Sequence, residues 1–291
     1  MPAEDRLALD IQTEGYAVVR NLFSAAEIAR LRGVLADHFA TRGVRLAAGR
    51  VQPNAAIEVP ALAWLYSSAE VVALFRRALG TDDIVFTGHC DIHCDIRSGW
   101  HKDSGNGPGD YFRGDYFAAP QCKVYKMAIY LQDHVGDGSG LNVDPRSHHT
   151  AACKPAAPLA LDTAAGDVVL FDVRLSHSGQ RPNAFERFLQ LAGKPARLLR
   201  HTDRNPILSD IHHRTLKAGV RNRRFSIFFT FGFPNAFTDD FARGNMRRQV
   251  RQTHTSDRVM PAALFEGLAR AGVRHAAVLE RPNDPGRTLP S

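Results

Sequence analysis

Residues 100–104 read Trp-His-Lys-Asp-Ser, and this stretch decides how the rest of the chain is interpreted. Side chains two positions apart on a β-strand point to the same face, so His101 and Asp103 can bind one metal ion. A glycine-rich run, residues 104–109, follows directly. A strand end beside such a loop is open to molecules that arrive from solvent. We therefore predict a metal site at the end of a strand.

Two other His-x-Asp triplets precede this one, in residues 88–96, which read Gly-His-Cys-Asp-Ile-His-Cys-Asp-Ile. On a strand, the cysteines and isoleucines share an apolar face and the histidines and aspartates share a polar one. Cys90 and Cys94 would then lie about 13 Å apart, too far to bind one zinc ion. We expect the polar face to line the same cavity as the metal, with His93 or Asp95 near the metal or the substrate.

The third ligand is predicted at His177. Residues 166–179 read Gly-Asp-Val-Val-Leu-Phe-Asp-Val-Arg-Leu-Ser-His-Ser-Gly, a buried strand that runs into a turn of small residues. A lone histidine is more often structural, but small neighbours leave room for a ligand. His148 and His149, in a predicted loop, are second candidates. Two imidazoles and one carboxylate form the facial ligand set of non-haem Fe(II) oxygenases, which leaves coordination positions open for reactants.

Short strands separated by Gly, Pro and Asn, without regular helices between them, predict a mainly β fold, a sandwich or a barrel. The predicted strands are 15–20, 84–97, 123–132, 140–144, 167–173, 187–191 and 225–231. Ser24 and Glu27 form a capping-box pattern at the start of a helix, and residues 69–79 have helical periodicity. Past residue 235 the chain is helical in character. Its predicted apolar face, which packs on the outside of the β core, is Phe265, Leu268, Ala269 and Val273.

The chain has 291 residues, 44% of them hydrophobic, with no linker or internal repeat, so a single domain over 1–291 is predicted. No signal-type segment opens the chain and no apolar run reaches about 20 residues, which predicts a soluble, cytoplasmic protein without a membrane partner. Its four cysteines are expected to be free thiols. The net charge of +7 comes mainly from arginine. Without aromatic and basic residues interleaved, we expect no nucleic-acid partner.

These motifs, taken in order, resemble the phytanoyl-CoA dioxygenase family of Fe(II)- and 2-oxoglutarate-dependent oxygenases over nearly the whole chain. The resemblance lies in residues 15–19, 100–103, 128–134, 137–148 and 176–179. It implies a double-stranded β-helix, or jelly roll, with Fe(II) held by His101, Asp103 and His177 and with 2-oxoglutarate and O2 as co-substrates. Halogenating relatives lack this carboxylate, so Asp103 implies hydroxylation or a related oxidation such as ring closure or desaturation.

The resemblance also implies an arginine, on the strand after the distal histidine, that binds the far carboxylate of 2-oxoglutarate. Arg187 lies 187 − 177 = 10 residues past His177, near the family's usual interval, and Arg224 lies 224 − 177 = 47 past it. We favour Arg224, because it opens the better strand and shares a face with Ser226. This choice implies an insertion at about 192–222, whose arginines and histidines could form a cationic lid.

On the strand 123–132, Lys126 and Tyr130 share one face, and relatives place a polar 2-oxoglutarate contact at the position of Lys126. The alternative for Lys126 is exposure at a sheet edge. The chain departs from the family at Arg146, where relatives usually carry Gly, and at Asp144, which replaces an apolar residue. We expect this loop to be reshaped around a polar substrate.

The sequence therefore predicts an Fe(II)- and 2-oxoglutarate-dependent dioxygenase. Its substrate would be a small polar metabolite, anionic or sugar-like, and succinate and CO2 would be released. The alternative is a non-oxygenase cupin-type metal-binding protein or isomerase, which would use the same fold. Formation of succinate from 2-oxoglutarate separates the two.

Overall fold

The structure is a computed structural model that describes residues 3–46, 49–96, 98–105, 111–112, 114–136, 140–179, 223–253 and 259–283. The predicted strand 187–191, Arg187 itself and the predicted insertion at about 192–222 lie outside the described residues. Within these ranges, no helix is both long enough and apolar enough to cross a membrane.

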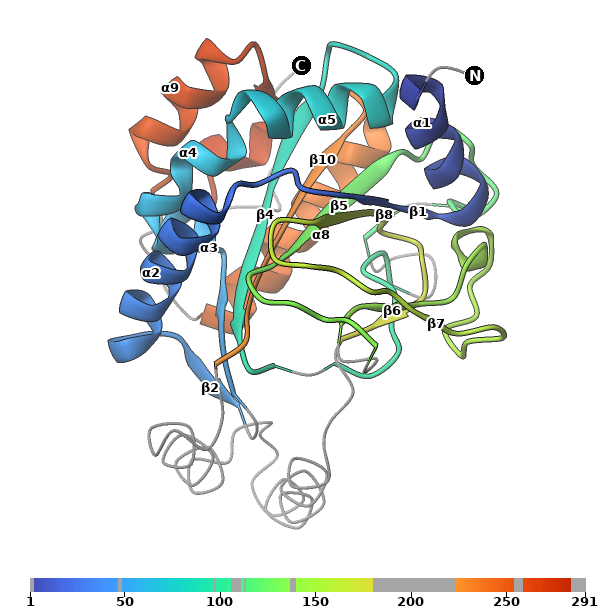
Figure 1. Ribbon diagram of the computed structural model, residues 1–291. Coiled ribbons are helices and arrows are strands. Elements are labelled where there is room, and N and C mark those ends of the chain that lie inside the picture. Colours follow the sequence, from blue (N-terminus) through green and yellow to red (C-terminus); the bar gives the residue numbers. More distant parts are fainter. Residues whose placement is uncertain are drawn as a thin grey trace, which may run out of the picture.

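The larger layer is an eight-stranded sheet (Figure 1). Its order is β1 (Tyr16–Val19), β8 (Val168–Asp172), β5 (Val124–Tyr130), β10 (Phe225–Gly232), β4 (Val85–Cys94), β3 (Gly49–Pro53) and β2 (Val44–Leu46). Neighbours along this path are antiparallel. The eighth strand, β11 (Arg274–His275), pairs with β4 in parallel. Strands distant in sequence therefore lie side by side, with β5, β10 and β4 at the centre.

A smaller sheet of β7 (Leu159–Ala160), β6 (Asn142–Val143) and β9 (His177–Ser178) forms the second layer. Alternate side chains of β5, β8 and β10 point toward this sheet and pack against it in one buried apolar cluster, which includes Tyr130, Val143, Phe171 and Phe228. Two antiparallel sheets packed face to face are the architecture of a jelly roll. The predicted mainly β jelly-roll fold is confirmed.

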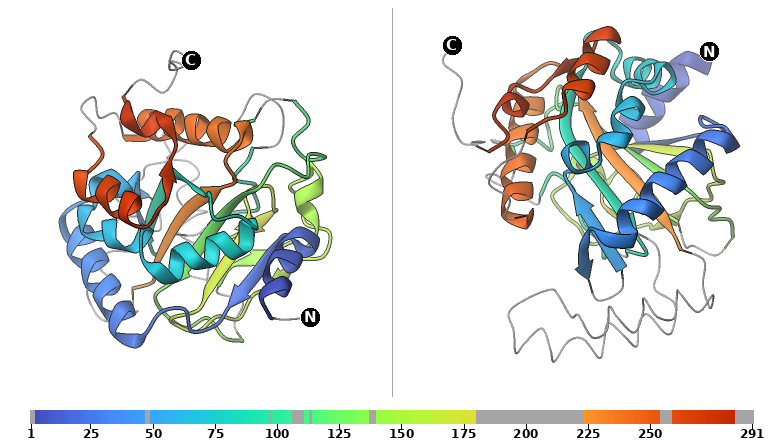
Figure 2. Two further views of the ribbon diagram at one scale, coloured as in Figure 1. Left: turned by 90° about the horizontal axis from the view of Figure 1, so that it is seen from above. Right: turned by 90° about the vertical axis from the view of Figure 1, so that its left-hand side faces the viewer.

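Helices cover the other face of the larger sheet (Figures 1 and 2). They are α1 (Ala3–Glu14), α2 (Ala25–Thr41), α3 (Ala55–Glu58), α4 (Ala63–Tyr66), α5 (Ala69–Leu79) and α9 (Ala262–Arg270), with 3-10 turns η1 (Pro60–Leu62) and η3 (Ala277–Glu280). The helix α8 (Ala236–Thr253) also contacts the opposite face of β4, through His89 and Asp91. The 3-10 turn η2 (Ser147–His149) follows β6 of the smaller sheet. The main core lies between α2, α5, α9 and the strand residues that point away from the smaller sheet. Cys90 and Cys94 belong to this core, as the alternation of residues 88–96 predicted.

Local signals explain several of these boundaries. The Ser24 side chain accepts from the Glu27 N–H (3.3 Å) and the Glu27 carboxylate accepts from the Ser24 N–H (2.8 Å), which is the predicted capping box at the start of α2. The helix α5 has the predicted bounds. The segments that were not predicted include α1, the β2–β3 hairpin and the short helices α3 and α4. The apolar face of α9 is also rotated from its predicted position, because Leu264 is buried and Ala269 is exposed.

Candidate metal centre

The two sheets bring His101, Asp103 and His177 together. One ligand atom from each of these side chains lies within 4.8 Å of the other two. Asp103 Oδ2 is 3.5 Å from His177 Nε2, and Asp103 Oδ1 is 3.8 Å from His101 Nε2. Across the described ranges, this is the group of three side chains that has metal-binding geometry. The residues predicted from 100–104 and from the distal turn therefore meet at one point.

The backbone sets the separation of the two histidines. The His101 N–H donates to the His177 carbonyl (2.9 Å), and the His177 N–H donates to the His101 carbonyl (3.0 Å). This reciprocal pair extends the smaller sheet by one bridge and brings the two ring centres to 4.3 Å. The positions of both imidazoles therefore follow from main-chain pairing and not from contacts between the rings alone.

Both imidazoles turn the same nitrogen toward Asp103. His101 Nδ1 lies 2.8 Å from the Gly99 carbonyl, and His177 Nδ1 lies 3.0 Å from the Leu175 carbonyl. A carbonyl only accepts hydrogen bonds, so each Nδ1 carries a proton, and in the neutral form of each ring the lone pair is on Nε2. Burial and the neighbouring His101 lower the pKa of His177 to about 3. His177 is therefore neutral near pH 7, which is the form that binds a metal.

The Asp103 carboxylate is held in its ionised form. Burial alone would raise its pKa, but the Lys126 ammonium, followed by the two imidazoles, lowers the pKa far below its ordinary value. Lys126 Nζ lies 2.9 Å from Asp103 Oδ2. Lys126 is only 7% exposed, on a strand that is paired on both sides, so the alternative of an exposed sheet edge is wrong. Two Nε2 atoms and an ionised carboxylate are a donor set that fits a divalent transition metal.

A small cavity of about 70 Å³ adjoins the three residues. His101 and His177 line it together with Lys126 and Tyr130 of β5 and Ser226 of β10. His93 of β4 also lines the cavity, and burial lowers its pKa to about 4. Apolar walls come from Phe228, Leu141 and Ile96. The cavity therefore combines imidazoles, hydroxyls and one ammonium with apolar surface.

Arg224 stands apart from the described lining of this cavity. It directly precedes β10, and its backbone N–H donates to Asp95 Oδ1 (3.0 Å), with its Nε 3.9 Å from the same oxygen. Asp95 has a left-handed backbone (φ 59°) and turns away from the strand at this point. Of the predicted pair at the start of β10, the structure therefore places Ser226 in the cavity and Arg224 beside Asp95.

The rest of the polar face of β4 attaches α8. Asp91 Oδ2 lies 3.1 Å from an Arg248 guanidinium nitrogen and 3.4 Å from His89 Nε2, and the Gln249 amide donates to Asp91 Oδ1 (3.3 Å). The sequence reasoning expected this face to line the cavity, and it missed Arg248 as a partner. The signal in the sequence was a general one: a carboxylate that is buried inside a sheet, as Asp91 is, needs a cation nearby, but the sequence does not show which cation. Nothing in α8 marks Arg248 among its other arginines.

Lys102, between the two predicted ligands, points in the opposite direction. It is 5% exposed, and its ammonium donates to the carbonyls of Ser147 and Arg174, both at 2.7 Å. Burial lowers the pKa of Lys102 to about 8. Because residue 174 lies in the turn that leads to His177, Lys102 ties the two ligand-bearing segments to each other.

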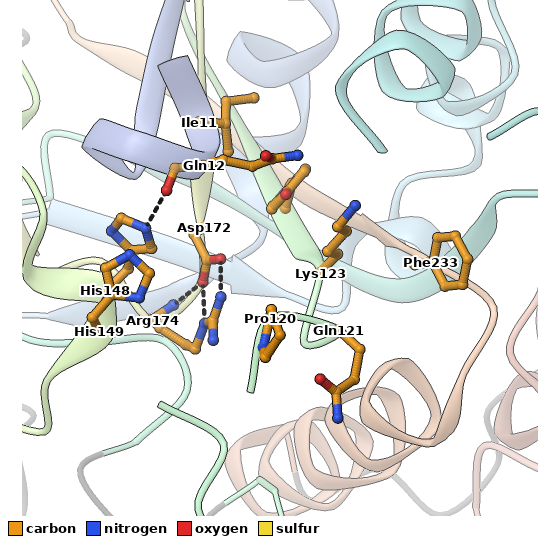
Figure 3. Close-up of a pocket in the computed structure, with 11 residues that line it drawn as sticks. Ile11, Gln12, Pro120, Gln121, Lys123, His148, His149, Asp172, Arg174 and Phe233 are labelled. Atoms are coloured by element: carbon orange, nitrogen blue, oxygen red, sulfur yellow. Dashed lines mark hydrogen bonds and ion pairs between the residues drawn. The ribbon is translucent and has the colours of Figure 1, made fainter. Parts of the chain in front are cut away.

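A larger cavity, about 560 Å³, lies elsewhere, between α1, the beginning of β5 and η2 (Figure 3). His148 and His149 line it, and the Gln12 carbonyl accepts from His148 Nε2 (3.1 Å). At its floor, Arg174 and Asp172 bond to each other at 2.8 Å. The second-candidate histidines therefore belong to this pocket and not to the metal-binding group.

Comparison with solved structures identifies the fold. The chain has the fold of 2-oxoglutarate-dependent enzymes. It matches the α-ketoglutarate-dependent epimerase SnoN of nogalamycin biosynthesis with a TM-score of 0.53 and 16% identity, over 81% of this chain and 88% of SnoN. HygX of Streptomyces hygroscopicus with nickel and 2-oxoglutarate matches at 0.53 and 16%, over 80% and 88%.

EctD of S. alaskensis, with 2-oxoglutarate and 5-hydroxyectoine, matches at 0.52 and 17%, over 80% of this chain and 76% of EctD. No family model matches the sequence, and the search of curated proteins found no match. At these identities the likeness establishes the fold. The resemblance to the phytanoyl-CoA dioxygenase family stays a prediction.

Proposed function

We propose that the protein is an Fe(II)- and 2-oxoglutarate-dependent dioxygenase of the phytanoyl-CoA dioxygenase type. The observation that carries this proposal is the convergence of His101, Asp103 and His177, with both Nε2 atoms turned toward an ionised carboxylate. The three residues would hold Fe(II) through two nitrogens and one oxygen. Solved structures of this fold contain the same chemistry in other proteins: HygX was solved with iron and, separately, with nickel and 2-oxoglutarate.

The bound metal, with 2-oxoglutarate and O2, supplies the oxidation of a C–H bond, and succinate and CO2 are the co-products. The chain supplies position and exclusion of water. The carbonyls of Gly99 and Leu175 hold the two imidazoles in the metal-binding tautomer. The apolar side chains of Phe228 and Leu141 limit the access of water to the reacting atoms.

The co-substrate is proposed to bind along β5 and β10. Ser226 and Tyr130 are register partners on these strands, and both line the cavity. Their hydroxyls and the Lys126 ammonium can donate to carboxylate oxygens. Arg224, two residues before Ser226, is proposed to bind the far carboxylate of 2-oxoglutarate. For this contact, its guanidinium must leave Asp95, which it faces at 3.9 Å, and turn to the co-substrate.

The substrate is proposed to be a small polar metabolite, anionic or sugar-like. The cavity offers His93 and Ser98 beside the proposed metal position, and the net charge of +7 favours anions. HygX, a structure of the same fold, was solved with hygromycin B bound. The carboxylate of Asp103, which halogenating relatives lack, favours hydroxylation or a related oxidation.

The test is anaerobic addition of Fe(II) and 2-oxoglutarate to the purified protein. We expect a weak visible absorption band from the chelate, and succinate formation once O2 is admitted. His177→Ala should abolish both. His275→Ala is the matched control, because His275 lies on β11 with Glu280 as its partner at 3.4 Å and stands outside the metal-binding group. A protein that binds metal but gives neither band nor succinate would be a cupin-type metal-binding protein or isomerase.

A further inference from the structure

The two oxygens of Asp103 have different surroundings. Oδ2 has Lys126 Nζ at 2.9 Å and His177 Nε2 at 3.5 Å, whereas Oδ1 faces His101 Nε2 at 3.8 Å. One of the two oxygens is therefore already bound to a cation that belongs to the chain itself.

Lys126 has little freedom to leave this position. Its ammonium lies 5.0 Å from the ring centre of Phe228 and 5.9 Å from that of Phe171, which belong to the strands on either side of β5. Aromatic faces attract a cation at such distances. The side chain is 8% exposed, so water cannot easily replace Asp103 as its partner. The ion pair is therefore built into the sheet.

We propose that Lys126 holds Oδ2 of Asp103 and thereby limits this carboxylate to one oxygen, Oδ1, toward the metal. This inference rests on the proposed function and adds a positioning role to Lys126 that is distinct from contact with the co-substrate. A carboxylate that is free on both oxygens can bind a metal through both of them. Holding one oxygen preserves an additional coordination position for reactants.

The same arrangement lowers the affinity of the site for metal. The Lys126 ammonium and a divalent metal would share one carboxylate, and two cations this close repel each other strongly in a partly buried site. Removing the charge of Lys126 should therefore tighten metal binding in two ways, by ending this repulsion and by releasing Oδ2. A lysine that only binds the co-substrate would leave metal affinity in the absence of 2-oxoglutarate unchanged. A lysine that only supports the fold would weaken metal binding when it is replaced.

The test measures binding of Mn(II) alone to the full-length protein, without 2-oxoglutarate, by competition with a fluorescent chelator. Lys126→Met keeps the length of the side chain and removes the charge. We expect it to bind Mn(II) at least about tenfold more tightly than the wild type. Lys123→Met is the matched control: Lys123 lies just before β5, with its ammonium 5.9 Å from the Phe233 ring, and should leave the affinity unchanged.

Equal or weaker Mn(II) binding by a folded Lys126→Met protein overturns the inference. If Lys126→Met does not fold, as judged by thermal unfolding, Lys126→Gln takes its place with the same expected direction. Failure of the proposed function looks different: the wild type would not bind Mn(II), or Asp103→Ala would bind it as well as the wild type does.

Discussion

Asp91 of β4 and Arg248 of α8 form an ion pair, with the carboxylate Oδ2 3.1 Å from a guanidinium nitrogen. This pair joins α8 to the central strand β4 of the larger sheet. Burial alone would raise the pKa of Asp91, but Arg248 and His89 lower it well below its ordinary value. We therefore expect the contact to stabilise the fold.

Asp91→Asn should lower the free energy of unfolding by roughly 2–4 kcal/mol at pH 7, because Arg248 loses its carboxylate partner, whose side chain is only 10% exposed. Asp83→Asn is the control, since Asp83 and Arg274 form an exposed pair with side chains 51% and 64% accessible. That change should cost less than about 0.5 kcal/mol. Urea unfolding measures both, and equal losses in the two variants would contradict the prediction.

The stabilisation from Asp91 should depend on pH. Its folded pKa lies below the unfolded value, so the contribution is complete above about pH 4–5 and is lost as the pH falls toward the folded pKa. The difference in unfolding free energy between wild type and Asp91→Asn should therefore be constant from pH 7 to 5 and shrink below pH 4. A difference that grows on acidification would show that another group dominates.

Metal should stabilise the fold through the three proposed ligands. A ligand present at about 100 times its Kd adds roughly 2.7 kcal/mol, so Mn(II) should raise the Tm of the wild type by roughly 5 °C. Asp103→Ala should not show this rise, and removal of Mn(II) with a chelator should reverse it. Scanning fluorimetry with and without Mn(II) measures the shift. A similar rise in Asp103→Ala would place the metal elsewhere.

Arg224→Ala should weaken 2-oxoglutarate binding to the metal-loaded protein by roughly 10- to 100-fold, because one charge-assisted contact to a carboxylate is lost. Metal affinity should be retained. Arg223→Ala is the control, since the neighbouring side chain on an extended segment points to the opposite side. Titration of the visible chelate band gives both affinities. If Arg187→Ala and not Arg224→Ala weakens binding, the arginine that lies nearer to His177 in sequence is the carboxylate anchor.

Arg146 has a left-handed backbone, with φ at 66°, a conformation that favours Gly over residues with a Cβ. Its guanidinium compensates by bonding Glu14 of α1 at 2.7 Å. Arg146→Ala loses this bond and keeps the strained backbone, whereas Arg146→Gly loses the bond and relieves the strain. We expect the Gly variant to unfold roughly 2–4 °C higher than the Ala variant. Identical Tm values would remove the backbone explanation.

Local patterns predicted much of this structure. The alternation of residues 88–96 assigned Cys90 to the core, because the two-residue period of a strand can be read directly from sequence. The sequence also predicted that His101, Asp103 and His177 come together, and they do, but the predicted strand through His101 was wrong: β4 ends at Cys94, and His101 forms an isolated bridge to His177. The failures involve long-range contacts, such as Arg248 with Asp91, and short polar elements such as the β2–β3 hairpin. Such contacts leave no periodic signal in either partner.

The anchor at Lys102 changes how the short motif around it should be interpreted. Its ammonium donates to two carbonyls at 2.7 Å each, and so joins the turn that follows β6 to the turn that precedes β9. The residue between His101 and Asp103 therefore has a structural role in this chain, although the general His-x-Asp motif allows any residue at that position. A design that transfers residues 101–103 to another scaffold, or a search for this motif in other sequences, should therefore keep the lysine together with the histidine and the aspartate.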